Sequence, residues 1–147
     1  MTRKTIFNKY KMVMGVVVQL SMMWSTKCQT GTYMGYTNGK QQCIEVVFNY
    51  SSTRKLMQVE LTVQCTGLRV CSPELDYDWL VPHYPFAVEP FSEKDLGDYR
   101  EHVYDSCQLK SSSTIQNEFR TFFPNDDDSV IRVEFYSEIV SLKKGKC

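Results

Sequence analysis

Residues 42–65 read QCIEVVFNYSSTRKLMQVELTVQC, two apolar runs joined by a short polar segment. In the second run, alternate positions from Met57 to Cys65 are apolar or cysteine, and the positions between them are polar. Such alternation is typical of a strand with one buried face. In the first run the more apolar set starts at Ile44. The segment therefore predicts an antiparallel hairpin with its turn at 51–55.

The pattern also fixes which side chains share a face of this hairpin. If both apolar sets face one core, Cys43 points outward and Cys65 inward, so these two cysteines are not expected to pair. The same parity places Asn49 outward, beside the turn. Asn49-Tyr50-Ser51 is an N-glycosylation sequon, and we expect a glycan there, although the tripeptide can also arise by chance.

The segments on either side of the hairpin contain local signals for a turn, for interrupted structure and for one helix. Asn38-Gly39 is typical of a type I′ hairpin turn. Residues 66–91 contain four prolines, which argue against a continuous helix or a central strand. Ser92 resembles an N-cap, and the apolar spacing that follows predicts one short helix over 93–104.

The C-terminal part predicts another hairpin. Ile115, Phe119 and Phe123 share one strand face, residues 124–129 form a turn, and one strand covers 130–142. In total the pattern predicts five or six strands and one helix. The fold class expected is mainly β, a small disulfide-stabilised antiparallel sandwich or barrel with one short helix.

The N-terminal segment is expected to be a signal peptide. Four basic residues and no acidic ones lie within residues 1–11, and an apolar run of 13 residues follows at 12–24. That run is too short to span a bilayer comfortably. We expect a signal peptide over 1–27 and a secreted disulfide-rich domain over 28–147, with no membrane anchor after cleavage. An uncleaved anchor and a buried N-terminal strand are the alternatives.

Removing residues 1–27 changes the charge balance. The chain has 17 basic and 17 acidic side chains, and the leader contains five basic residues and no acidic ones. The remainder has 12 basic against 17 acidic side chains, a net charge of −5. An acidic domain has no general attraction for phosphate backbones, so nucleic acid is not expected as a partner.

The cysteines are typical of an extracellular framework. All six follow the apolar run, and an even number in a secreted chain indicates three disulfides of unassigned connectivity. No Cys-x-x-Cys is present, which argues against a zinc site. The six residues are Cys28, Cys43, Cys65, Cys71, Cys107 and Cys147.

The segment 75–91 combines aromatic and acidic residues and supplies the candidate binding site. Aromatic side chains are enriched at binding hot spots, and the interleaved acids would suit a basic protein partner. The alternative is that the segment covers the core. The binding residues predicted are Asp76, Tyr77, Asp78, Trp79, His83 and Tyr84.

The sequence predicts neither catalysis nor a metal or cofactor. His83 and His102 are the only histidines that a hydrolase could use as a base, and no nucleophile motif accompanies them. The acids at 74–78 and 126–128 lack EF-hand spacing. We therefore expect a secreted non-enzymatic binding protein (an effector, toxin-like factor or inhibitor) with an extracellular protein partner. The alternative is an extracellular carrier with a small hydrophobic ligand inside a β-barrel or sandwich.

Overall fold

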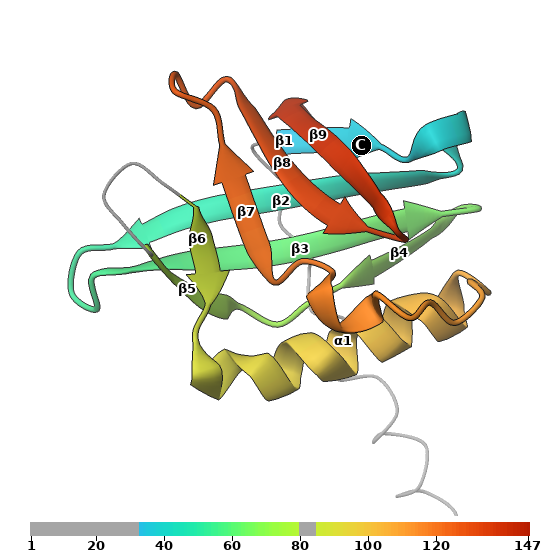
Figure 1. Cartoon of the computed structure of the whole chain (residues 1–147), viewed down its shortest axis with the longest axis horizontal. Helices are drawn as coiled ribbons and strands as arrows, with labels where there is room; N and C mark the ends of the chain where they lie inside the picture. Colours follow the sequence, from blue (N-terminus) through green and yellow to red (C-terminus); the bar gives the residue numbers. More distant parts are fainter. Residues whose placement is uncertain (1–32, 80–84) are drawn as a thin grey trace, which may run out of the picture.

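The computed structural model describes residues 33–79 and 85–147 (Figure 1). Nine strands and one α-helix lie in these ranges, with three short 3-10 helices, η1 (Asn38–Lys40), η2 (Pro90–Ser92) and η3 (Ile115–Asn117). The larger elements are β1 (Tyr33–Tyr36), β2 (Gln42–Ser51), β3 (Leu56–Cys65), β4 (Leu68–Cys71), β5 (Leu75–Trp79), β6 (Phe86–Val88), α1 (Glu93–Ser106), β7 (Thr121–Pro124), β8 (Val130–Phe135) and β9 (Glu138–Lys144).

The strands form a closed antiparallel barrel. Eight of them follow one another around it in the order β1-β2-β3-β5-β6-β7-β8-β9, and β9 pairs with β1 to complete the circle. The short β4 pairs with β3 outside this circle. The expected mainly β, antiparallel, disulfide-stabilised fold with one helix is thus confirmed, and of the two architectures considered it is the barrel.

The β2–β3 hairpin has the register that its alternation predicts. Ten residue pairs join the strands, and Ile44 lies opposite Val63. The turn before it lies where Asn-Gly predicted it, but the positive φ angles fall on Gly39 (78°) and Lys40 (55°), one position later than expected. A 3-10 turn therefore replaces the expected type I′ turn.

The expectation that the prolines of 66–91 exclude a central strand is wrong, because β5 lies between β3 and β6 in the sheet, and β4 and β6 also fall in this segment. The described prolines interrupt none of these strands. Pro73 lies between β4 and β5, Pro85 immediately precedes β6, and Pro90 starts η2. Proline disrupts a strand only where its missing N–H is needed, so strands of three to five residues fit between the prolines.

The C-terminal expectation is also partly wrong. Phe119 has a φ of 54° and lies before β7, which reverses the predicted parity, so that Phe122 is buried and Phe123 is exposed. The single strand expected over 130–142 is divided by a two-residue turn. Tyr136 and Ser137 form it with φ angles of 50° and 62°, a conformation that sequence signals assign to Asn and Gly.

Helix α1 confirms the short helix and extends it by two residues. Leu96, Tyr99 and Val103 are buried, as their spacing predicts, and Tyr104 is buried as well. Ser92 precedes the helix, but its hydroxyl makes no cap hydrogen bond. The Ser92 Oγ instead accepts a hydrogen bond from the backbone N–H of Asp76 at 3.0 Å, which joins the start of the helix to β5.

Aromatic side chains fill the barrel interior. Phe122 packs against Phe48, Phe86 and Tyr77, with ring centroids 5.1, 5.6 and 5.3 Å apart. Phe119 stacks on Phe135 with a centroid distance of 5.0 Å. The inward side chains of the other strands join this single cluster. An eight-stranded barrel is just wide enough to be filled by its own side chains.

Two disulfides connect distant parts of the barrel. Cys43 bonds to Cys147 and Cys65 to Cys107, which confirms that Cys43 and Cys65 do not pair with each other. Cys71 is disulfide-bonded as well, and Cys28 lies outside the described residues. Disulfides indicate an oxidising compartment. No helix in the described ranges is long and apolar enough to cross a membrane.

Candidate functional site

Strand β5 carries three of the predicted binding residues, and its alternation separates them. Tyr77 points inward and is fully buried. Its hydroxyl donates a hydrogen bond to the backbone oxygen of Phe119 at 2.6 Å, and burial raises the pKa of its phenol. Tyr77 is therefore a core residue, as the core-cover alternative expected, and a partner cannot reach its ring in this structure.

Asp76 points to the outside of the barrel but is only 6% exposed. Its backbone oxygen accepts a hydrogen bond from the Glu89 N–H, and its carboxylate oxygen Oδ2 forms an ion pair with the guanidinium of Arg54. The other carboxylate oxygen, Oδ1, is buried and has no hydrogen-bond partner among the described residues. Asp76 therefore positions its neighbours and offers little surface to a partner.

The remaining predicted binding residues divide into two groups. Asp78 is exposed on the same outer face of β5 as Asp76. Trp79 ends β5, where its backbone pairs with Phe86. His83 and Tyr84 lie outside the described residues. The structure thus places Asp76 and Asp78 together on one face.

Phe91 is the exposed aromatic residue next to this face. It is 60% exposed and lies in η2, directly before the serine that binds the Asp76 backbone. The guanidinium carbon of Arg54 lies 5.9 Å from the centroid of the Phe91 ring, a cation–π arrangement. Arg54 comes from the β2–β3 turn and is the residue that pairs with Asp76. We call Arg54, Asp76, Asp78 and Phe91 the Phe91 surface.

Three of the four residues of this surface, all except Arg54, lie in the segment 75–91 from which the sequence predicted the site. Phe91 belongs to the aromatic stretch from which the site was predicted, and the preceding Pro90 marks a turn where an aromatic side chain can stay exposed. Arg54 lies 22 residues before Asp76 in a polar turn with no distinguishing pattern. Only the β3–β5 pairing brings the two together.

Acidic side chains lie near the Phe91 surface on two neighbouring segments. Glu74 precedes β5 and accepts a hydrogen bond from the side-chain amide of Gln58. Glu93 and Asp95 occupy the first turn of α1. The acids at 74–78 do not converge on one point, and the described residues contain no group of three metal-ligating side chains. The arrangement is an exposed aromatic ring with acidic side chains nearby, which suits contact with a partner more than ion binding.

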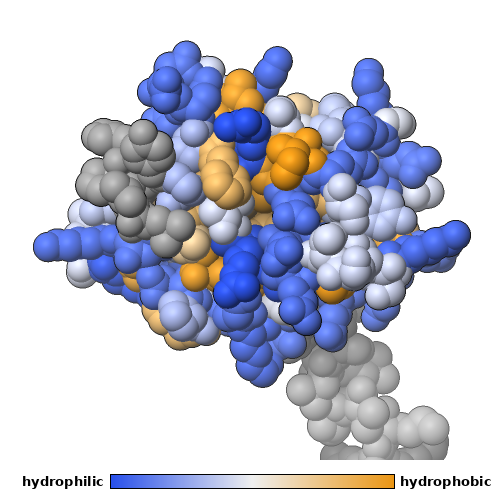
Figure 2. All heavy atoms as spheres, in the orientation of Figure 1, coloured by the Kyte–Doolittle hydropathy of each residue, from blue (hydrophilic) through white to orange (hydrophobic). Residues whose placement is uncertain are grey.

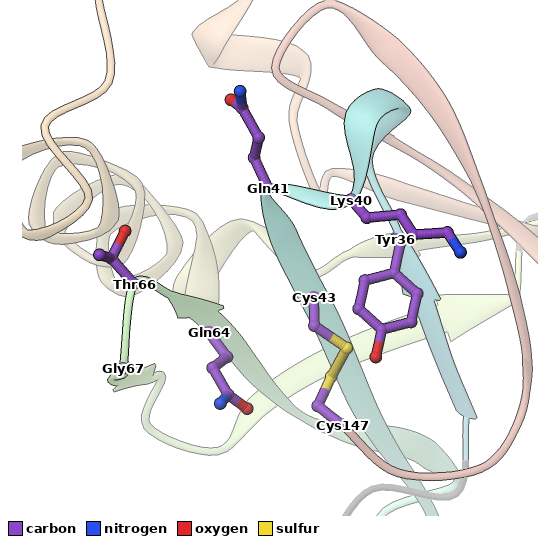
Figure 3. Close-up of a pocket in the computed structure, with 8 residues that line it drawn as sticks. All are labelled: Tyr36, Lys40, Gln41, Cys43, Gln64, Thr66, Gly67 and Cys147. Carbon is purple, nitrogen blue, oxygen red and sulfur yellow. A yellow bond between two sulfur atoms is a disulfide. The ribbon is translucent and has the colours of Figure 1, made fainter.

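A separate polar pocket of about 170 Å³ lies at the open end of the β2–β3 hairpin, away from the β2–β3 turn (Figure 3). Its walls come from the end of β1 and the turn after it (Tyr36, Lys40, Gln41) and from the end of β3 and the turn after it (Gln64, Thr66, Gly67). The Cys43–Cys147 disulfide lies between these two walls. Small-molecule sites are usually larger than about 300 Å³ and mostly apolar. This pocket has neither property.

His102, one of the two histidines considered as a base, is exposed on α1.

No protein family model, curated protein or solved structure matches this chain. The function is therefore inferred from the geometry of the chain itself.

Proposed function

We propose that this protein is a secreted, non-enzymatic binding protein that contacts an extracellular protein partner through the Phe91 surface. The observation that supports the proposal most directly is the exposure of Phe91 beside an ion pair that lies against its ring. Arg54 covers one side of the ring, and Arg54 is itself held by the nearly buried Asp76. An anchor positioned in this way loses little conformational entropy when it binds.

The exposed area of the Phe91 side chain is large enough for a binding hot spot. An aromatic side chain that is 60% exposed leaves roughly 100 Å² to be covered by a partner. At about 25 cal/mol per Å², its burial contributes about 2–3 kcal/mol. The acidic side chains Glu93 and Asp95, in the first turn of α1, favour a partner with basic residues around an apolar pocket, although Glu93 also forms an ion pair with Arg120 at 3.8 Å.

Other features support an extracellular setting for this partner. Asn49 of the sequon is exposed on the outer side of β2, beside the β2–β3 turn, where a glycan would displace no packed side chain. The two described disulfides each join segments far apart in sequence, which stabilises a small domain outside the cytosol.

The experiment compares two exposed aromatic residues. A photo-crosslinking amino acid is placed at position 91 or at position 50 of the full secreted chain, and captured proteins are identified from native extracellular fluid. Tyr50 is the matched control, because it is 58% exposed but lies outside the Phe91 surface. We expect capture at position 91 alone. With the purified partner, Phe91→Ala should weaken binding about 30-fold or more and Tyr50→Ala should not. Unchanged binding of Phe91→Ala contradicts the proposal.

The alternative function is that of a carrier for a small hydrophobic ligand. It is favoured by the closed eight-stranded barrel, an architecture that can enclose one small ligand. The aromatic packing around Phe122 argues against it, because those rings occupy the centre of the barrel. Organic extraction of the purified protein followed by mass spectrometry distinguishes the two, since a stoichiometric bound lipid would favour the carrier.

A further inference from the structure

The outer face of β7, β8 and β9 exposes two large apolar side chains beside two charged ones. Phe123 on β7 is 43% exposed and Ile139 on β9 is 62% exposed. Between them, β8 presents Arg132 and Glu134 to the outside, because the alternating residues of that strand are buried. Figure 2 shows apolar side chains at the surface among charged ones on this side of the molecule, and α1 does not cross it in Figure 1.

The register places these side chains in two rows across the three strands. In one row, Phe123 lies opposite Arg132, and Arg132 lies opposite Ser141. In the neighbouring row, Glu134 lies opposite Ile139, with Thr121 on the β7 side. Each row therefore contains one large apolar residue, one charged residue and one small polar residue. We call these six residues the β7–β9 face.

The two charges at the centre of this face have no ion-pair partner in the part of the chain that the structure describes. Neither Arg132 nor Glu134 belongs to any of the ion pairs formed among the described residues. Opposite charges on adjacent outward positions of one strand form a self-complementary pattern. A second copy can lie face to face with the first, related to it by a 180° rotation about an axis that runs in the plane of the face, between the two rows and parallel to them. This rotation places Arg132 of each copy over Glu134 of the other.

The same rotation also matches the sizes of the outer residues. It places Phe123 over Thr121 of the other copy and Ile139 over Ser141, so that each large side chain meets a small one. We propose that the β7–β9 face is an interface between two copies of this chain, arranged as a two-fold symmetric dimer. The occupant is a second copy because the face complements itself in both charge and shape, which an unrelated partner would not require.

This interface is separate from the Phe91 surface. Phe91 lies in η2 and contacts Arg54 of the β2–β3 turn, and none of the six residues of the β7–β9 face belongs to either element. A dimer would carry two copies of the Phe91 surface. The two proposals can therefore fail independently.

The test is sedimentation equilibrium of the full secreted protein over a range of concentrations. Arg132→Glu and Glu134→Arg should each raise the dimer dissociation constant about tenfold or more, because each creates two symmetry-related repulsions. The double variant Arg132→Glu/Glu134→Arg restores opposite charges and should return to within about threefold of the original value. Ile139→Lys should give a monomer, and Tyr50→Lys, at an exposed aromatic outside the face, should not change the dimer.

Two results would overturn the proposal. One is a monomer at every concentration up to about 1 mM, the weak limit of a specific interaction. The other is a dimer in which the double charge variant is no tighter than the single variants, since that excludes the pairing of Arg132 with Glu134. Thermal unfolding of each variant establishes that the changes leave the exposed strands folded.

Discussion

The β2–β3 hairpin and the two seams that close the barrel are held together by different means. Ten residue pairs join β2 to β3, whereas two pairs join β1 to β9 and two join β6 to β7. The hairpin therefore has redundant backbone pairing. The seams depend on a small number of side chains, and single substitutions there should have larger effects than equivalent ones in the hairpin.

The side chains at the seams are specific. Beside β1–β9, the Tyr33 hydroxyl donates to the backbone oxygen of Asp128 at 2.9 Å, and Glu138 accepts from the Asn38 N–H at 2.8 Å. At β6–β7, the Phe86 ring stacks on that of Phe122. The seams are thus closed by tertiary contacts, which strand alternation does not reveal.

The largest effect is expected from the disulfide that spans the β1–β9 seam. Cys147 follows β9 and Cys43 lies on β2, so the bond holds the C-terminal segment across β1, and the Cys147 N–H also donates to buried Glu45 at 2.8 Å. Replacing both cysteines with serine should reduce the free energy of unfolding by about 4–5 kcal/mol, from the loop entropy of a 104-residue separation. Urea unfolding measures the loss.

The matched control is the pair Cys65→Ser/Cys107→Ser. Its separation is 42 residues, so the same model predicts a loss smaller by about 0.8 kcal/mol. A larger loss for this pair than for Cys43 and Cys147 would show that the seam is not the weaker region.

The next effect concerns adjacent residues of β7. Phe122 is fully buried in the aromatic cluster, while Phe123 is exposed on the outer face. Phe122→Ala should cost about 3–5 kcal/mol because it leaves a cavity at the β6–β7 seam. Phe123→Ala, measured in dilute solution where the chain is monomeric, should cost less than about 1 kcal/mol. Equal losses for the two variants would contradict the strand parity that the structure assigns to β7.

The same contrast explains how much of the fold could be predicted from the sequence. The β2–β3 register followed from alternation, and so did the separation of Cys43 from Cys65. The parity of β7 did not follow, because it depends on the positive φ of Phe119, a residue type that rarely adopts it. The turn at Tyr136 and Ser137 was missed for the same reason, since tertiary contacts override local preference there.

The candidate site was predictable only as a region. The aromatic and acidic composition of 75–91 pointed to the correct neighbourhood, but composition does not tell which side chains are inward. Tyr77 proved to be in the core, while Phe91 proved to be exposed. Arg54 could not be assigned to the candidate site from the sequence, because its contact with Asp76 depends on a strand pairing between segments that are distant in sequence.

A third prediction compares two glycines. A Cβ on Gly35 of β1 would lie 2.5 Å from the backbone oxygen of Ser141 in β9, so glycine permits the close approach at this seam. Gly35→Ala should therefore cost about 2–3 kcal/mol. Gly97 of α1 has open space around its Cβ position, and Gly97→Ala should stabilise by about 0.5–1 kcal/mol. Thermal unfolding of both variants checks the difference, and a neutral Gly35→Ala would mean that the strands separate without cost.

The smallest effect arises from a buried polar cluster beside the β6–β7 seam. Glu118 is fully buried, and its Oε1 accepts hydrogen bonds from the Tyr104 hydroxyl at 2.6 Å and the Tyr136 N–H at 3.0 Å. Arg100 donates from Nε to the backbone oxygen of Glu118 at 2.7 Å. The Glu118 Oε2 and the Arg100 Nη2 have no hydrogen-bond partner among the described residues. The cluster joins α1 to the β8–β9 turn.

This cluster should make the stability of the seam depend on pH. Burial raises the pKa of Glu118 above its ordinary value of 4.5, so between that value and the folded pKa the native state binds more protons than the unfolded state. The free energy of unfolding should therefore fall as the pH rises through this window, and Glu118→Gln should remove that part of the slope. Urea unfolding between about pH 4 and about pH 8 measures both proteins.

The matched control for this last prediction is Glu60→Gln on β3. Burial also raises the pKa of Glu60, but its side chain is half-buried, so its contribution to the slope should be smaller. If the Glu118→Gln and unmodified curves remain parallel, Glu118 titrates alike in the folded and unfolded states. The buried carboxylate would then be fully compensated by Tyr104 and Tyr136, and the seam would be as insensitive to pH as the β2–β3 hairpin.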